Sequence, residues 1–167
     1  MQRELEGWQS TQERGDDGVV HSDERVHARH PVVAPSPAGA LHLGDRYFSE
    51  VARATRGSMR RRDTASGVEL SLFAFGPSLL RFGPPELQVS VDHVSCRYPI
   101  CGGLLARRPG GAITLSQRGT DEPELRATVT AFVPRLALPL LYDRLQHQLH
   151  VRISRRYFRR LIAEAAG

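Results

Sequence analysis

Lysine and asparagine are absent from this chain of 167 residues, so all 23 of its basic residues are arginines. This pattern is typical of coding bias in a GC-rich genome, and arginine identity alone is therefore weak evidence for a guanidinium-specific role. The charge is also uneven, because residues 1–30 hold four arginines and seven acids while the rest of the chain has an excess of arginine. The net positive charge of residues 31–167 is compatible with binding to an acidic partner.

Long apolar runs are absent too. No segment reaches the roughly 20 apolar residues of a membrane-spanning helix, and the start of the chain lacks the apolar centre of a signal peptide. A cytoplasmic protein is the default expectation. Cysteine is scarce, and the spacing of Cys96 and Cys101 fits neither a zinc knuckle nor a redox pair. We expect two reduced thiols and no disulfide.

Signature motifs of common enzymes are missing. The sequence has no Gly-x-Ser-x-Gly nucleophile motif, no phosphate-binding Walker loop and no glycine fingerprint for a dinucleotide. Motifs therefore predict no cofactor and assign no catalytic residue. Whether the protein is an enzyme stays open at this point.

The N-terminal segment, residues 1–37, is rich in charge, Gly, Gln and Ser, and it ends in Pro31, Pro35 and Pro37. Such a composition buries too little apolar surface to offset the loss of chain entropy on folding. The sequence therefore predicts a disordered tail over residues 1–37, followed by a single domain over residues 38–167.

Apolar side chains recur with a period of two from Ser58 to Val133, which favours six or seven short strands joined by turns. A short helix is predicted before them, at Asp45–Thr55, and a long C-terminal helix after them, at Pro139–Ala166. Together these patterns predict an α+β fold, a curved antiparallel sheet of six to seven strands wrapped around the long C-terminal helix.

The clearest predicted hairpin joins Glu86–Val91 to Val94–Ile100 through a two-residue turn, Asp92-His93. This turn length pairs Val89 with Cys96. It also places six side chains on the core face of the sheet, which are Leu87, Val89, Val91, Val94, Cys96 and Tyr98. A further strand is expected at Gly103–Arg107.

Over roughly Leu43–Ala166, this architecture resembles the START-like superfamily of polyketide cyclases and lipid-transfer domains. The segments Arg97–Gly111 and Arg155–Phe158 are similar in style to uncharacterised members. The resemblance implies a helix-grip fold with an internal cavity, and no functional residue is transferred from it. That fold opens with a long strand, whereas the region before Leu43 is polar and broken by prolines. A lipocalin-like barrel or a β-roll with one helix is the structural alternative.

A pocket between the sheet and the first half of the long helix would bind an apolar small molecule or a lipid. Its expected lining consists of Leu70, Leu72, Val89, Tyr98, Val129, Leu145 and Leu149. The first alternative is a cyclase-like or hydrolase-like enzyme that uses Glu69, His93 or Tyr98 as acid or base in the same cavity.

A second alternative places function at the basic end of the long helix. Its arginines would contact an anionic membrane or, less expectedly, nucleic acid, and they are Arg152, Arg155, Arg156, Arg159 and Arg160. A simpler role for these arginines is to remain solvated and to stabilise the C-terminal end of the helix dipole. Asp143, His147 and His150 share one side of the same helix, but no His-Glu-x-x-His motif accompanies them. We therefore expect a solvated polar face and no metal.

Overall fold

The computed structural model of the protein describes residues 5–135 and 139–167, with only the backbone course of residues 139–147. This part of the chain has an α+β fold with nine strands and two helices. In chain order the elements are β1 (Gln9–Arg14), β2 (Val20–His27), α1 (Pro37–Ala54), β3 (Met59–Thr64), β4 (Gly67–Leu72), β5 (Ser78–Phe82), β6 (Glu86–Val89), β7 (His93–Gly102), β8 (Ala112–Arg118), β9 (Glu124–Phe132) and α2 (Pro139–Ala165). No helix among the described residues is long and apolar enough to cross a membrane.

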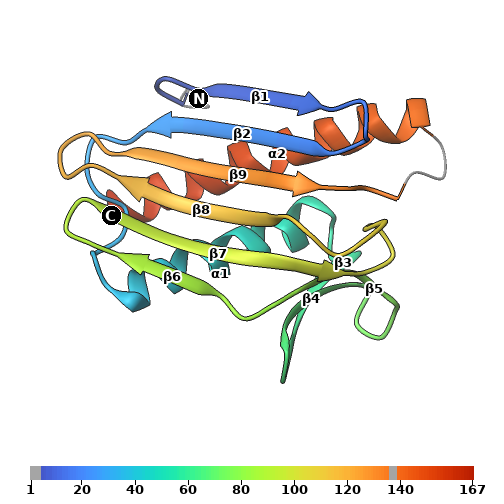
Figure 1. The fold of residues 1–167 in the computed structure, drawn as a ribbon. Helices are drawn as coiled ribbons and strands as arrows, with labels where there is room; N and C mark the ends of the chain where they lie inside the picture. Colours follow the sequence, from blue (N-terminus) through green and yellow to red (C-terminus); the bar gives the residue numbers. More distant parts are fainter. Residues whose placement is uncertain (1–4, 136–138) are drawn as a thin grey trace.

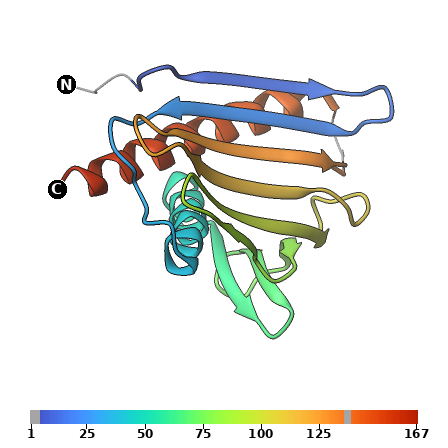
Figure 2. The same ribbon diagram turned by 60° about the vertical axis from the view of Figure 1, so that its left-hand side comes forward.

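All nine strands belong to one antiparallel sheet, with the order β1-β2-β9-β8-β7-β5-β4-β3 (Figure 1). Strands β5 and β6 pair with opposite ends of the same edge of β7. Both helices lie against one face of this sheet, which is open and curves around them (Figure 2). The described residues therefore contain nine strands, where the sequence predicted six or seven.

The predicted disordered tail is wrong for residues 9–27, which form β1 and β2. Strand β2 pairs along its length with β9, the last strand of the chain. The sequence misled because β1 is an edge strand with mostly exposed side chains, and because the buried face of β2 includes Ser22 and Glu24. The following segment is anchored as well, since the buried Gln117 amide hydrogen-bonds to the backbone of Val33 in both directions.

Helix α1 begins eight residues earlier than the sequence predicted. The Ser36 hydroxyl accepts a hydrogen bond from the Gly39 N–H at 3.0 Å, and Pro37 occupies the first turn. Both features are typical of helix starts, because the first N–H groups of a helix lack partners and proline has none to lose. The extra turns carry Ala40 and Leu43 into the core.

The core lies between the two helices and the sheet. Tyr157 and Phe158 of α2 are fully enclosed, and their rings pack edge-on against Tyr47 of α1 and Trp8 at the start of β1. Tyr98 of β7 packs under α1, with its ring centroid 5.0 Å from that of Phe48. Residue 44 of α1 must be glycine there, because an added Cβ would lie 2.3 Å from the Tyr98 hydroxyl oxygen.

The β6–β7 hairpin differs from its predicted register. Its turn has four residues, closed by a 2.7 Å hydrogen bond from the Ser90 N–H to the His93 carbonyl. Val89 therefore pairs with Val94 and not with Cys96. The shift of two positions keeps the predicted face, but β6 is an edge strand, and Leu87, Val89 and Val91 are 39%, 38% and 82% exposed. Only the β7 half of the predicted core set is buried.

The strand expected at Gly103–Arg107 does not form. This segment follows the end of β7 as a loop whose N–H groups at Leu104 and Leu105 bond to carbonyls of Ser78 and Leu79. Gly103 has φ of 116°, a conformation that glycine adopts without strain. The segment therefore lies against β5 as a loop, at the point where the sequence predicted a new strand.

Candidate functional site

A cavity of about 410 Å³ lies between the sheet and the two helices. This volume is within the range of small-molecule sites. Every layer of the fold contributes to the lining, whose described members are Gln12, Val20, Ser22, Tyr47, Val51, Met59, Leu70, Leu80, Ile100, Leu105, Ile113, Val129, Phe132, Leu149, His150 and Ile153. Most of these side chains are apolar, because they come from the inward-facing positions of the strands and helices.

The polar lining groups gather on the β2 side of the cavity. Ser22 lines the cavity, and Glu24, two residues away on the same face of β2, is outside the described lining but contacts His150 of α2. The His150 Nε2 atom lies 2.9 Å from a Glu24 carboxylate oxygen and 3.2 Å from the Ser22 hydroxyl. Gln12 is the register partner of Ser22 on the neighbouring strand. We call Ser22, Glu24 and His150 the β2–α2 cluster.

Burial differs sharply within the β2–α2 cluster. The Glu24 side chain is fully enclosed, whereas the His150 side chain remains 18% exposed. One carboxylate oxygen of Glu24 has no hydrogen-bond partner among the described residues.

The Tyr47 hydroxyl is close enough for the Glu24 charge to act on it. Burial, and secondarily that charge, raise the pKa of Tyr47 above its ordinary value, so Tyr47 stays protonated at neutral pH.

The cluster lacks the geometry of a serine nucleophile relay. A relay needs the hydroxyl on one ring nitrogen of the histidine and the carboxylate on the other. Here Ser22 and Glu24 both approach Nε2. The arrangement can hold an ion pair and present hydroxyl groups to a ligand, but it does not pass a proton from serine to carboxylate.

Of the seven residues predicted to line a pocket, Leu70, Val129 and Leu149 do line this cavity. Tyr98 lies in the aromatic packing beneath α1, and Val89 lies on the edge strand. Leu72 is half-buried at the end of β4, outside the described lining. The side chain of Leu145 falls outside the described residues.

The three groups predicted as acid or base do not converge. Glu69 bonds to Arg62 on the neighbouring strand β3. His93 lies at the β6–β7 turn beside Arg118. Tyr98 is enclosed in the core, where burial raises its pKa well above the ordinary value. The polar side chains that line the cavity are instead Gln12, Ser22, Tyr47 and His150, and Glu24 is linked to them through its contact with His150.

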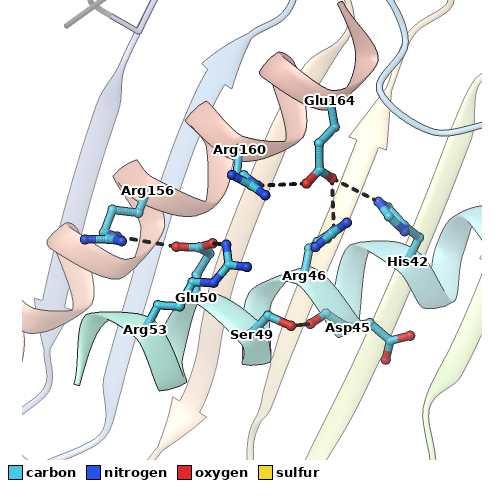
Figure 3. Close-up of polar contacts among 9 residues, drawn as sticks. All are labelled: His42, Asp45, Arg46, Ser49, Glu50, Arg53, Arg156, Arg160 and Glu164. Carbon is cyan, nitrogen blue, oxygen red and sulfur yellow. Dashed lines mark hydrogen bonds and ion pairs between the residues drawn. The ribbon is translucent and has the colours of Figure 1, made fainter. Parts of the chain in front are cut away.

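The arginines predicted to bind anions are largely engaged within the protein (Figure 3). Arg156 reaches the buried Glu50 of α1 at 3.4 Å, and Arg160 bonds to Glu164 at 2.8 Å. Arg155 stacks over the Trp8 ring. Arg159 is half-buried, and only Arg152 is exposed without a partner among the described residues. These ion pairs use much of the positive charge that would attract an anionic surface.

Helices α1 and α2 are joined by a second set of charges on the same face. Glu164 lies within 2.9 Å of Arg46 and 3.6 Å of His42 in α1 (Figure 3). Glu50 also accepts a 3.0 Å bond from Arg53. These contacts position α2 over α1 and hold His150 of α2 against β2.

No group of three or more His, Cys, Asp and Glu side chains gathers among the described residues. His150 contacts Glu24 and Ser22, while the side chains of Asp143 and His147 fall outside the described residues.

Sequence reasoning missed Glu24 and Ser22, since they lie in the segment predicted to be a tail. The sequence carried little signal, because both faces of β2 carry polar side chains and the alternation of burial along it is seen only in the fold. Comparison with protein-family models, curated proteins and solved structures finds no match to this chain.

Proposed function

We propose that the protein binds an apolar small molecule or a lipid in the cavity between the sheet and the two helices. The observation that carries this proposal is the cavity of about 410 Å³, with largely apolar walls and polar groups gathered on one side. Apolar walls favour transfer of a hydrocarbon chain from water at about 25 cal/mol per Å² of buried surface. A few convergent polar groups orient such a ligand.

The strand order supports the same proposal. The early strand β2 pairs with the final strand β9, and α2 lies across the sheet that they complete. This is the arrangement expected of a START-like, helix-grip protein, whose fold encloses a ligand. We therefore extend the proposal to a binding protein of START-like architecture, in which the cavity holds its ligand without a catalytic step.

The experiment compares wild-type protein with Val129→Phe in titrations with a fluorescent fatty-acid probe. Val129 lines the cavity, so a larger ring there occupies space that the probe needs. Val91→Phe is the matched control, because Val91 is 82% exposed on the edge hairpin. Native mass spectrometry of the purified wild-type protein reports any ligand that co-purifies.

We expect wild type and Val91→Phe to bind the probe alike, and Val129→Phe to bind it at least about tenfold more weakly. Circular dichroism confirms that each variant is folded. The proposal fails if wild-type protein binds no probe, or if folded Val129→Phe binds it as tightly as wild type.

A further inference from the structure

Glu24 is the most deeply buried acid in the described part of the chain. Its side chain is fully enclosed, and one of its carboxylate oxygens has no hydrogen-bond partner there. His150 is its one cationic partner among these residues, at 2.9 Å. A buried carboxylate is stable only when a neighbouring charge compensates it. Any positive charge on His150 is thus balanced by Glu24 before any ligand enters.

The 2.9 Å contact with Glu24 occupies the single hydrogen-bonding position of His150 Nε2, so this atom is not available to accept a hydrogen from Ser22. Ser22 therefore keeps its own O–H hydrogen available, and protonated Tyr47 offers another on the same cavity wall. These groups present hydrogen-bond donors to the cavity while the β2–α2 cluster has no net charge.

We propose that the cavity selects an amphiphile whose head is an uncharged oxygen group, an alcohol or a carbonyl, over the same chain ending in a carboxylate. This inference rests on the proposed function. A neutral oxygen accepts hydrogen bonds from Ser22 and Tyr47 at little electrostatic cost. A carboxylate brings a second negative charge into the cavity, where His150 is the one cationic side chain in the described lining and is already paired with Glu24, so the lost hydration of the carboxylate is not replaced.

The experiment measures the affinities of decanol, decanoate and decylamine by displacement of the fluorescent probe from wild type, Glu24→Gln and Glu50→Gln. Glu24→Gln keeps the shape of the side chain and removes its charge. His150 is then free to balance the charge of a bound carboxylate. Glu50→Gln is the matched control, since Glu50 is also a buried, ion-paired acid, but its partners are Arg53 and Arg156, which do not line the cavity, whereas the partner of Glu24 is the lining residue His150.

We expect wild type and Glu50→Gln to prefer decanol over decanoate by at least about tenfold, and Glu24→Gln to lose or reverse this preference. Equal binding of the three compounds by wild type would overturn the inference while leaving the proposed function intact. Tightest binding of decylamine would also overturn it, because the unpartnered Glu24 oxygen would then contact the ligand directly. If none of the three compounds displaces the probe, the cavity does not bind them. That result would contradict both this inference and the proposed function.

Discussion

At the scale of single residues, the two cysteines occupy opposite environments. Cys96 is fully buried in β7, and burial raises the pKa of its thiol, whereas Cys101 is exposed. Since the thiolate is the reactive form, Cys96 is doubly protected. We expect a thiol-specific reagent to label one site in the native protein, and Cys101→Ser to label none until denaturant is added. Rapid labelling of native Cys101→Ser would contradict this burial.

His93 should titrate below the ordinary histidine range. Partial burial and, second, the nearby Arg118 guanidinium lower its pKa from 6.5. Both causes disfavour the imidazolium, so His93 takes up its proton only at lower pH. Arg118→Ala removes the smaller cause, and the midpoint should rise while staying below 6.5. Proton NMR of the ring over a pH series measures both values, and an unchanged midpoint would show that Arg118 has no influence.

Residue by residue, the sequence indicated the apolar side of the cavity better than its polar side. Leu70, Val129 and Leu149 were predicted from alternation and helical spacing, which report directly on the inward face. Glu24 was not predicted, since a charged residue in a polar segment normally signals solvent. Its burial depends on His150, which is distant in sequence, and no local pattern encodes that pairing.

At the scale of elements, α1 and α2 are held together by acids that differ in burial. Glu50 is 3% exposed and pairs with Arg156 of α2, while the more exposed Glu164 pairs with Arg46 of α1 and, within α2, with Arg160. Losing a partner from a buried charge costs more than losing a solvated ion pair.

We therefore expect Arg156→Ala to lower the free energy of unfolding by about 1–2 kcal/mol, and Arg160→Ala to lower it by less than about 1 kcal/mol. Urea denaturation of both variants provides the comparison. Equal losses would mean that burial of Glu50 does not strengthen its pairing.

The β6–β7 hairpin offers a second contrast, because Val89 and Val94 are register partners with unequal burial. Val94 is 1% exposed and Val89 is 38% exposed. Val94→Asp buries an unpaired carboxylate and should cost several kcal/mol, about the stability of a typical domain. Val89→Asp should leave the protein folded, with a loss of about 1 kcal/mol. Thermal unfolding measures both, and loss of folding in Val89→Asp would place β6 in the core.

Element boundaries show where sequence patterns stop being informative. The pattern for α2 predicted residues 139–166, and the helix spans Pro139–Ala165. Likewise, β8 lies within the run of strands that the sequence predicted over residues 58–133. Both have long or regular apolar repeats. By contrast, α1 was predicted too short, since its first turns contain a proline and glycines, and β1 through β3 carry too few apolar side chains for a clear alternation.

At the scale of the whole molecule, the N-terminal hairpin β1–β2 completes one side of the sheet (Figure 1). Strand β1 forms the edge of the sheet, and Trp8, which precedes it, packs on Phe158 of α2. Strand β2 carries the buried Glu24 and Val26. The two strands should therefore differ in their importance for folding.

Deleting residues 1–18 removes β1 and should give a folded protein that is less stable by about 2–4 kcal/mol, mainly through lost apolar burial. Deleting residues 1–28 also removes β2, opens the cavity and should abolish cooperative unfolding. Urea denaturation monitored by circular dichroism tests both deletions. Full stability of the shorter deletion would show that β1 contributes nothing to the sheet.

The Glu24–His150 pair also has a consequence for how the strands find their alignment. In the observed register Glu24 lies opposite Ala127 of β9 and meets His150. A slide of β2 by two residues would keep its inward face but move the carboxylate away from the imidazole, at a cost of several kcal/mol. Because β2 has few apolar side chains to set its position, we expect this pair to favour the observed register over the shifted one.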